Sequence, residues 1–437
     1  MTKPKRAKSA AAPAAGPSAV TIFAYQVGFG DCFLLRFAYP DQLRHVLIDF
    51  GTTGLSAGAA ANSMKRIADD IAVKCGGKLD AVVATHRHQD HISGFARAEN
   101  RKGPGDVIRG LTPDVVIQPW TEQLDLPVDA TGPMKSAHRQ LAALEAMQAM
   151  SKEILSLTTT TRARRLPKPM VDELRFLGED NLSNRSAVEN LATMGARQVY
   201  VHHGSDAGLA EVLPGLKVDV LGPPTVAQSA SIRKMRASDP AEFWQLRLAQ
   251  LGAHEGKAGK SPVLFPQHVA APGGRLPMTA RWLASRIRRA YGEQMLSLVR
   301  ALDKQLYNTS VILLFQSENK KLLFPGDAQI ENWEYTLAQP ALSALLADVD
   351  LYKVGHHGSR NATPRTLWNG FRKKGNKSAT TRLETILSTR DNKHGSETRN
   401  TEVPRQTLVA ELNAHSHLHD TRALPDGVMY EEIHLDL

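Results

Sequence analysis

The chain has 437 residues, of which 42% are hydrophobic and 22% charged, so it is long enough and apolar enough to bury a substantial core. This composition excludes a chain that is disordered throughout, a collagen and a small disulfide-stapled scaffold. The 54 lysines and arginines outnumber the 44 acidic residues, and the formal net charge of +10 favours anionic partners without identifying one.

The N-terminus and the cysteines bear on the compartment. Residues 1–18 are rich in Lys, Ala and Pro, which predicts a disordered basic tail rather than a secretion signal. Cys32 and Cys75 could form at most one bridge, which is typical of a reducing compartment, so we expect a cytoplasmic protein. The sequence has no run of about 20 apolar residues, so we expect no membrane span.

Strand-length apolar runs, separated by turn residues, begin at Val20. The first predicted elements are strands at residues 20–27, 32–39 and 45–51, a helix at 63–74, and strands at 79–85 and 114–120. Strands that alternate with a helix favour the α/β class.

Two helix-rich blocks interrupt this pattern, at about residues 130–175 and 225–305. Strands are predicted between and after them, at 196–204, 216–224, 310–315, 320–328, 350–358 and 381–389, followed by a closing helix and strand. We therefore expect one domain over residues 19–437 with two helical insertions, which offer a surface for a protein partner. The oligomeric state stays open.

The clearest chemical motif is the segment T-H-R-H-Q-D-H at residues 85–91, at the end of a predicted strand. It contains four side chains that can bind a metal, namely His86, His88, Asp90 and His91. Imidazole nitrogens together with a carboxylate are donors that zinc accepts readily. His86 and His88 lie two residues apart, so in an extended segment they face the same side and can share one ion. The segment predicts a metal site rather than a chance surface cluster.

This segment matches the H-x-H-x-D-H motif of the metallo-β-lactamase fold, which the rest of the chain also resembles. The hydrolase domain of the ComEC-type competence proteins, with its stand-alone relatives, is similar in motif order over most of residues 20–410. The matching segments are Val27 to Asp31, Ile48 to Gly51, Asn308 to Leu314, Gly326 to Ala328 and Val354 to Ser359. The resemblance implies an αββα metallo-β-lactamase sandwich, of the α/β class, with two helical insertions.

The resemblance also implies two divalent metal ions, zinc in the first place and manganese as the alternative. Asp90 and His91 resemble the pair that serves the second ion, and Asp327 resembles the carboxylate that bridges both ions. Either His356 or His357 resembles the last ligand; adjacent residues of an extended segment point in opposite directions, so we expect only one to coordinate and favour His356. Asp90, His91 and Asp327 are the expected catalytic residues.

Four further positions are expected to support the ligands. Asp49 resembles a carboxylate that orients a ligand, although a turn-forming aspartate explains it equally well, and Asp31 has the same two interpretations. Asn308 and Ser310 begin the segment where typical lactamase-type enzymes have a third histidine, so the first ion would have fewer protein ligands. A histidine pair at 202–203 could replace it, but an ordinary strand end is the preferred interpretation.

Basic stretches help to choose a substrate. They lie at residues 162–168, 281–289 and 360–377. The third directly follows the last ligand segment, so Ser359, Arg360, Lys373 and Lys374 are expected to contact a phosphate-bearing substrate, unless the charges only solvate helix faces. His394, in a loose match to a family loop, is expected to contact substrate or transfer a proton, with an ordinary surface histidine as the alternative.

Two bound ions would lower the pKa of a water enough to supply hydroxide near neutral pH, and none of the usual serine or cysteine nucleophile motifs is present. We therefore expect a metal-dependent hydrolase. The resemblance implies a phosphodiesterase or nuclease that acts on DNA in a defence or DNA-processing system. The alternatives are a small-molecule hydrolase, acting on a nucleotide or a phospholipid head group, and, less favoured, a non-catalytic partner-binding module.

Overall fold

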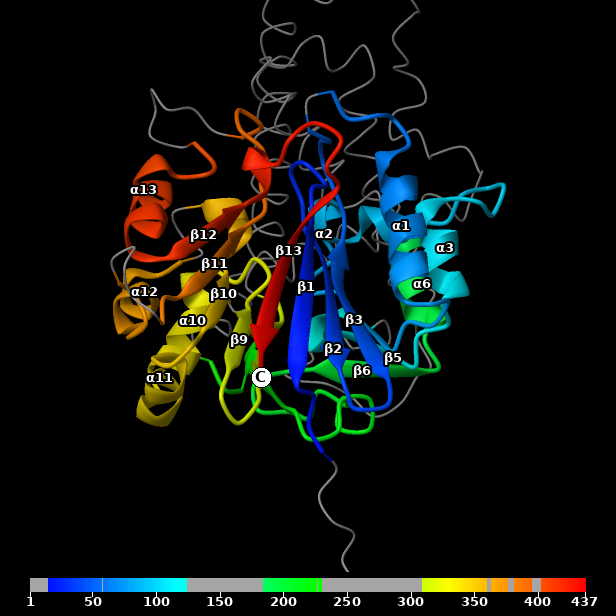
Figure 1. The fold of residues 1–437 in the computed structure, drawn as a ribbon. Helices are drawn as coiled ribbons and strands as arrows, with labels where there is room; N and C mark the ends of the chain where they lie inside the picture. Colours follow the sequence, from blue (N-terminus) through cyan, green and yellow to red (C-terminus); the bar gives the residue numbers. More distant parts are fainter. Residues whose placement is uncertain are drawn as a thin grey trace, which may run out of the picture.

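The computed structural model describes residues 15–56, 58–123, 184–225, 227–229, 309–359, 363–375, 381–394 and 402–437. These residues form two facing β-sheets with helices on the outer side of each, which is an αββα sandwich (Figure 1). The α/β class and the layered architecture expected from the sequence are confirmed. The predicted basic tail and the two predicted helical insertions fall almost entirely outside the described residues.

The first sheet has the strand order β13-β1-β2-β3-β4-β5-β6. Its strands are β1 (Ala19–Tyr25), β2 (Cys32–Ala38), β3 (Leu43–Phe50), β4 (Ala81–Val83), β5 (Val115–Pro119), β6 (Arg197–Val201) and β13 (Tyr430–Asp436). The strands from β3 to β6 run parallel to one another, and the other pairs are antiparallel.

The second sheet has the order β12-β11-β10-β9-β8-β7. Its strands are β7 (Lys217–Gly222), β8 (Ile312–Gln316), β9 (Lys321–Phe324), β10 (Leu351–Lys353), β11 (Glu384–Leu387) and β12 (His417–Asp420). The strands from β9 to β12 are parallel, so their carboxyl ends meet at one edge of the sheet.

Helices cover the outer face of both sheets (Figure 1). Those against the first sheet are α1 (Ser63–Lys74), α3 (Pro104–Gly110) and α6 (Arg185–Met194), while the four-residue α2 (Gln89–Ile92) lies in the motif segment. Those against the second sheet are α10 (Ile330–Leu337), α11 (Pro340–Leu346), α12 (Arg365–Gly370) and α13 (Gln406–His415). Three apolar cores result, one between the sheets and one beneath each helical layer.

The predicted strands are all present, most of them shortened by a few residues, and the predicted helix at 63–74 is α1 with the same bounds. Helices α3, α6, α10, α11 and α12 were not predicted. Each has ten residues or fewer, which is too short for a helical period to stand out from the neighbouring apolar strands.

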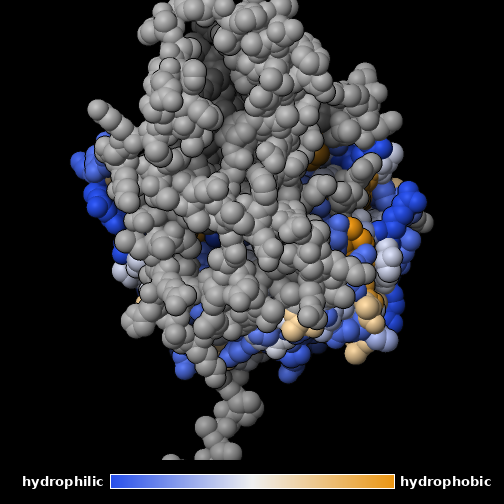
Figure 2. Space-filling model, turned by 180° about the vertical axis from the view of Figure 1, so that it is seen from behind, coloured by the Kyte–Doolittle hydropathy of each residue, from blue (hydrophilic) through white to orange (hydrophobic). Residues whose placement is uncertain are grey.

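The surface of the described residues is polar. Figure 2 shows the molecule from behind, where the described atoms that are visible are mostly hydrophilic. Large hydrophobic side chains are exposed at Leu43, Val73 and Val428. None of the helices in the described ranges is long and apolar enough to cross a membrane.

Candidate metal centre

The loop after β4 brings its histidines together. His86 and His88 precede α2, with His88 in extended backbone, and both side chains are buried. His86 Nε2 and His88 Nδ1 are 2.8 Å apart. Ligand atoms of His86, His88 and Asp90 all lie within 4.8 Å of one another. These three residues form the first ligand group.

A second ligand group consists of Asp90, His91, Asp327 and His357, all buried, with ligand atoms again within 4.8 Å of one another. His91 Nε2 lies 3.1 Å from Asp327 Oδ2, and His357 Nε2 lies 3.0 Å from Asp90 Oδ2. The residues come from the carboxyl ends of β4, β9 and β10, so the two sheets contribute jointly. Asp90 belongs to both groups and joins them.

The structure does not support the preference for His356 over His357. His357 is fully buried among the ligands, whereas the side chain of His356 is 17% exposed and its Nε2 lies 3.9 Å from Asp327 Oδ2. The preference for His356 assumed that residues 356 and 357 have extended backbone. Both residues have positive φ, 41° and 51°, so the alternation of an extended chain does not apply to them.

Each histidine of the second ligand group is held at its other nitrogen. His91 Nδ1 donates to Asp49 Oδ2 at 2.7 Å, and His357 Nδ1 donates to the Ser388 carbonyl at 3.0 Å. Asp49 in turn accepts hydrogen bonds from the backbone N and the hydroxyl of Thr85, both at 2.7 Å. Both Nε2 atoms therefore face the cluster, because an acceptor at Nδ1 fixes the tautomer and ring orientation of a metal-binding histidine. This geometry favours Asp49 as an orienting carboxylate over a turn former.

Close packing at the end of β3 requires glycine at position 51. A Cβ at Gly51 would lie 2.4 Å from the backbone N of His91. Any other residue would force α2 away from Asp49, and the hydrogen bond between Asp49 and His91 requires this approach.

Asp31 pairs with a buried lysine. Lys353 Nζ contacts Asp31 Oδ2 and lies 3.6 Å from Asp327 Oδ1, and the side chains of Lys353 and Asp31 are each 1% exposed. Burial alone would lower the pKa of Lys353, but Asp31 and Asp327 outweigh it and raise that pKa above its ordinary value. Asp31 thus holds a positive charge beside the ligands, which goes beyond shaping a turn.

The charges and the unsatisfied atoms fit divalent metal ions. Asp90 Oδ1 and both carboxylate oxygens of Asp327 are buried without a hydrogen bond of good geometry among the described residues. Burial alone would raise the pKa of Asp327, but His91, His357 and His356 outweigh it and hold that pKa well below its ordinary value. Buried charged oxygens that lack a well-formed hydrogen bond cost free energy, and a cation bound between them lowers that cost. The first ligand group could hold one ion and the second ligand group another.

Ser310 supports the turn that carries Asp327. Its hydroxyl accepts a hydrogen bond from the Asp327 backbone N at 3.3 Å, and its carbonyl accepts one from Asn332 at 2.8 Å. This position agrees with a supporting role. Asn308 lies outside the described residues, so its role stays a prediction.

Two of the predicted substrate residues lie far from the ligands. Lys373 pairs with Asp350 at 2.7 Å, just before β10, and its carbonyl accepts from the backbone N of Leu383, just before β11. Lys374 lies over the Trp368 ring, 5.1 Å from its centroid. His357 follows the carboxyl end of β10, so Lys373 and Lys374 are at the opposite end of the sheet. The prediction that Lys373 and Lys374 contact the substrate rested on their closeness in sequence to the last ligand segment. The length of β10 separates them from His357 in space.

The other predicted substrate residues have different positions. The Ser359 hydroxyl lies 3.0 Å from His356 Nδ1, beside the ligands. Arg360 lies outside the described residues. The basic stretches at 162–168 and 281–289 also lie outside them.

His394 lies beside the cluster. Its ring packs edge-on against Phe29 with centroids 4.4 Å apart, and Phe29 packs against His357 at the same distance. Burial and, as a smaller cause, the positive charge of Lys393 lower the pKa of His394 to about 4. The structure therefore brings this loop histidine close to the ligands and keeps its imidazole neutral at neutral pH.

Three residues at the site were not predicted from the sequence, namely Thr85, Lys353 and Phe29. A lysine inside the apolar run at 351–354 was the one available signal, because an unpaired charge is not tolerated in a buried strand. Thr85 and Phe29 carry no local signal, because their importance comes from partners distant in the chain. At the histidine pair 202–203, His203 Nδ1 donates to the Leu221 carbonyl at 2.9 Å, which agrees with the preferred structural interpretation.

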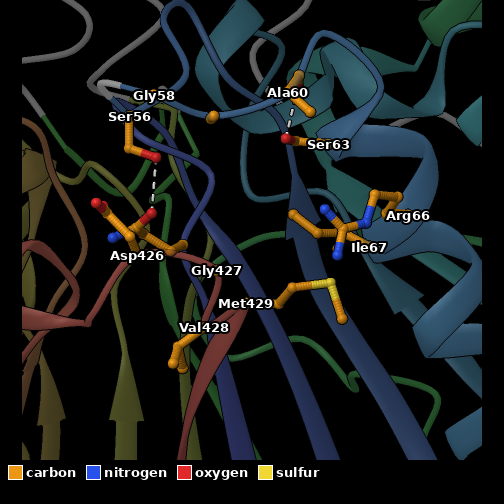
Figure 3. A pocket seen from close by; sticks show the side chains of 12 residues that line it. Ser56, Gly58, Ala60, Ser63, Arg66, Ile67, Asp426, Gly427, Val428 and Met429 are labelled. Carbon is orange, nitrogen blue, oxygen red and sulfur yellow. Dashed lines mark hydrogen bonds between the residues drawn. The ribbon is translucent and has the colours of Figure 1, made fainter.

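A separate hollow of about 250 Å³ lies between the loop after β3 and the loop before β13 (Figure 3). Ser56 and Asp426 line one side, and Ser63, Arg66 and Ile67 line the other. The Ser56 hydroxyl donates to Gln26 Oε1 at 2.7 Å. Its lining contains none of the residues of the two ligand groups.

Comparisons with known proteins return few matches. No protein-family model matches the sequence, and no curated protein matches it significantly. Among solved structures, the chain is similar to the metallo-beta-lactamase fold protein YhfI from Bacillus subtilis, with 10% sequence identity and a TM-score of 0.34. The alignment covers 96% of this chain and 100% of that protein.

Proposed function

We propose that this chain is a metal-dependent hydrolase, specifically a two-metal phosphodiesterase that cuts DNA. The observation that carries the proposal is the pair of buried ligand groups joined by Asp90. Two ions held in this way would lower the pKa of a water molecule and stabilise the negative charge that develops on a phosphodiester. Zinc is the first candidate metal and manganese the second, because imidazole and carboxylate donors suit both.

The chain's own residues prepare this chemistry. Asp49 and the Ser388 carbonyl fix the tautomers of His91 and His357, so both Nε2 atoms are available as ligands. His394 packs against Phe29, which in turn packs against His357, so its ring lies beside the second ligand group. The side chains of the two ligand groups are almost completely buried, so bulk solvent contacts little of their surface.

Positive charge at the rim of the cluster supports a polyanionic substrate. Lys393 is exposed and adjoins His394, and the Arg390 guanidinium donates to the Leu55 carbonyl on the neighbouring loop. A Cβ at Gly54 would lie 3.4 Å from side-chain atoms of both Arg390 and Lys393. The two cationic side chains therefore lie close together over Gly54. Among the described residues, these cations replace Lys373 and Lys374 as the proposed phosphate contacts.

We expect Lys393→Ala to weaken DNA binding. KM for DNA should rise several-fold with little change in kcat, and the slope of log KM against log salt should fall by about one, because one phosphate contact is lost. Lys374→Ala is the matched control and should change neither quantity. Equal effects of the two substitutions would contradict this placement of the substrate.

The central experiment measures metal-dependent cutting. The metal-stripped protein is incubated with plasmid, single-stranded DNA, RNA and a generic phosphodiester, with zinc or manganese added, and with a chelator. We expect DNA to be cut only with added metal, and a variant combining Asp90→Ala with His91→Ala to be inactive. Equal cutting by both proteins would indicate a contaminant. Hydrolysis of the generic phosphodiester alone would favour a small-molecule enzyme, and no hydrolysis of any substrate would overturn the proposal.

A further inference from the structure

A second cluster of metal-binding side chains lies at the open edge of the sandwich, where β12 ends one sheet and β13 ends the other. Glu384 is the first residue of β11 and stands opposite His417 in the register of β11 and β12. His419 lies two residues further along β12, so its side chain is on the same face as that of His417. None of these residues belongs to the metal centre described above.

The three side chains converge on one point. Glu384 Oε2 lies 2.9 Å from His417 Nδ1 and 2.8 Å from His419 Nε2. The two imidazole rings have centroids 4.6 Å apart. One ligand atom from each residue lies within 4.8 Å of the other two. Two histidines two apart on a strand, with a carboxylate across from them, are donors that a zinc-like ion accepts.

The other sheet supplies an orienting group. Glu431 of β13 contacts His419 Nδ1 through its carboxylate. This contact places the proton on Nδ1 and turns Nε2 toward Glu384, which is the arrangement that carboxylates impose on metal-binding histidines. Ile386 and Ile433, two residues after the respective glutamates, pack in the core between the sheets. Both carboxylates therefore face the space between the sheets, at its edge.

The cluster stabilises positive charge. Burial alone would lower the pKa of His419, but hydrogen bonds with Glu384 and Glu431 outweigh it and raise that pKa to about 9. A divalent ion would replace the proton as the positive charge between these groups. The side chain of His417 is 63% exposed, so an ion can enter from solvent without an opening of the fold.

We propose that Glu384, His417 and His419 bind one divalent transition metal ion of the zinc class, with Glu431 as the residue that orients His419. The three protein ligands leave a position for water or for a donor from another molecule. The site is independent of the proposed hydrolase activity. Because Glu431 belongs to the other sheet, the ion would also strengthen the connection between β12 and β13, two strands that share no backbone ladder.

The test compares zinc binding by metal-stripped full-length proteins. Isothermal titration and elemental analysis should show one zinc equivalent fewer for His417→Asn than for the wild type. His434→Asn is the matched control, because His434 is equally exposed, at 61%, and lies on β13; it should bind as many equivalents as the wild type. Glu384→Gln, which preserves the shape of the side chain, should also lose one equivalent.

The same comparison in the variant combining Asp90→Ala with His91→Ala separates the two centres. Zinc should raise the Tm of that variant, and adding His417→Asn should remove this rise. If His417→Asn and Glu384→Gln both bind as many zinc equivalents as the wild type, the cluster is an ion-paired contact only and the proposal is overturned. The result does not depend on hydrolytic activity, so each proposal can fail without the other.

Discussion

Asp327→Asn should slow the proposed hydrolysis of a phosphodiester by about a thousandfold. Asp327 is fully buried and faces His91 and His357, and the amide preserves its shape while removing the negative charge that a metal ion needs. The charge stabilisation that metal ions supply in such sites is worth several kcal/mol, and each 1.4 kcal/mol corresponds to about tenfold in rate. The measurements are kcat on DNA and the metal content of the purified protein, which should both fall.

Asp348→Asn is the control for this substitution. Asp348 is 40% exposed, pairs with Arg372, and lies before β10 at the opposite end of the strand from the ligands. It should leave both rate and metal content unchanged. A rate for Asp327→Asn within about tenfold of the wild type would exclude Asp327 from the ligand set.

Lys353→Met should lower the free energy of unfolding by about 3–5 kcal/mol, because it leaves the buried carboxylate of Asp31 without its cationic partner. Methionine has a similar volume, so the effect would come from charge rather than from a cavity. Both partners are 1% exposed, which prevents solvent from compensating the charge. Urea denaturation followed by circular dichroism measures the change.

Two comparisons distinguish this charge effect from general damage. Lys320→Met removes a partner of Asp350 that is 33% exposed and should cost less than about 1 kcal/mol, because Lys373 still pairs with Asp350. Adding Asp31→Asn to Lys353→Met removes the unpaired charge and should recover most of the lost stability. A double variant no more stable than Lys353→Met would show that the pairing with Asp31 is not the cause.

The architecture and much of the candidate site were predictable from local patterns. Apolar runs of strand length, bounded by turn residues, located the strands. A half-buried strand alternates apolar and polar residues, and a fully buried strand is a continuous apolar segment. The segment at residues 85–91 identified four candidate ligands, and the resemblance to the metallo-β-lactamase fold added the Gly-Asp turn after β9 and the histidine pair after β10. The four residues of that segment are close together in the sequence, so they are visible without knowledge of the fold.

The sequence by itself determined which residues of the segment at 85–91 could bind metal and which segments form strands, since both depend on neighbours in the chain. Only the tertiary structure places His357 rather than His356 among the buried candidate ligands, because positive φ angles turn that segment out of the extended form. The tertiary structure also pairs Lys353 with Asp31 and places Lys373 and Lys374 away from the ligands. It brings Glu384, His417 and His419 together beside Glu431 of the other sheet. Contacts between strands depend on sheet order and register, and neither is encoded in the spacing of residues along one segment.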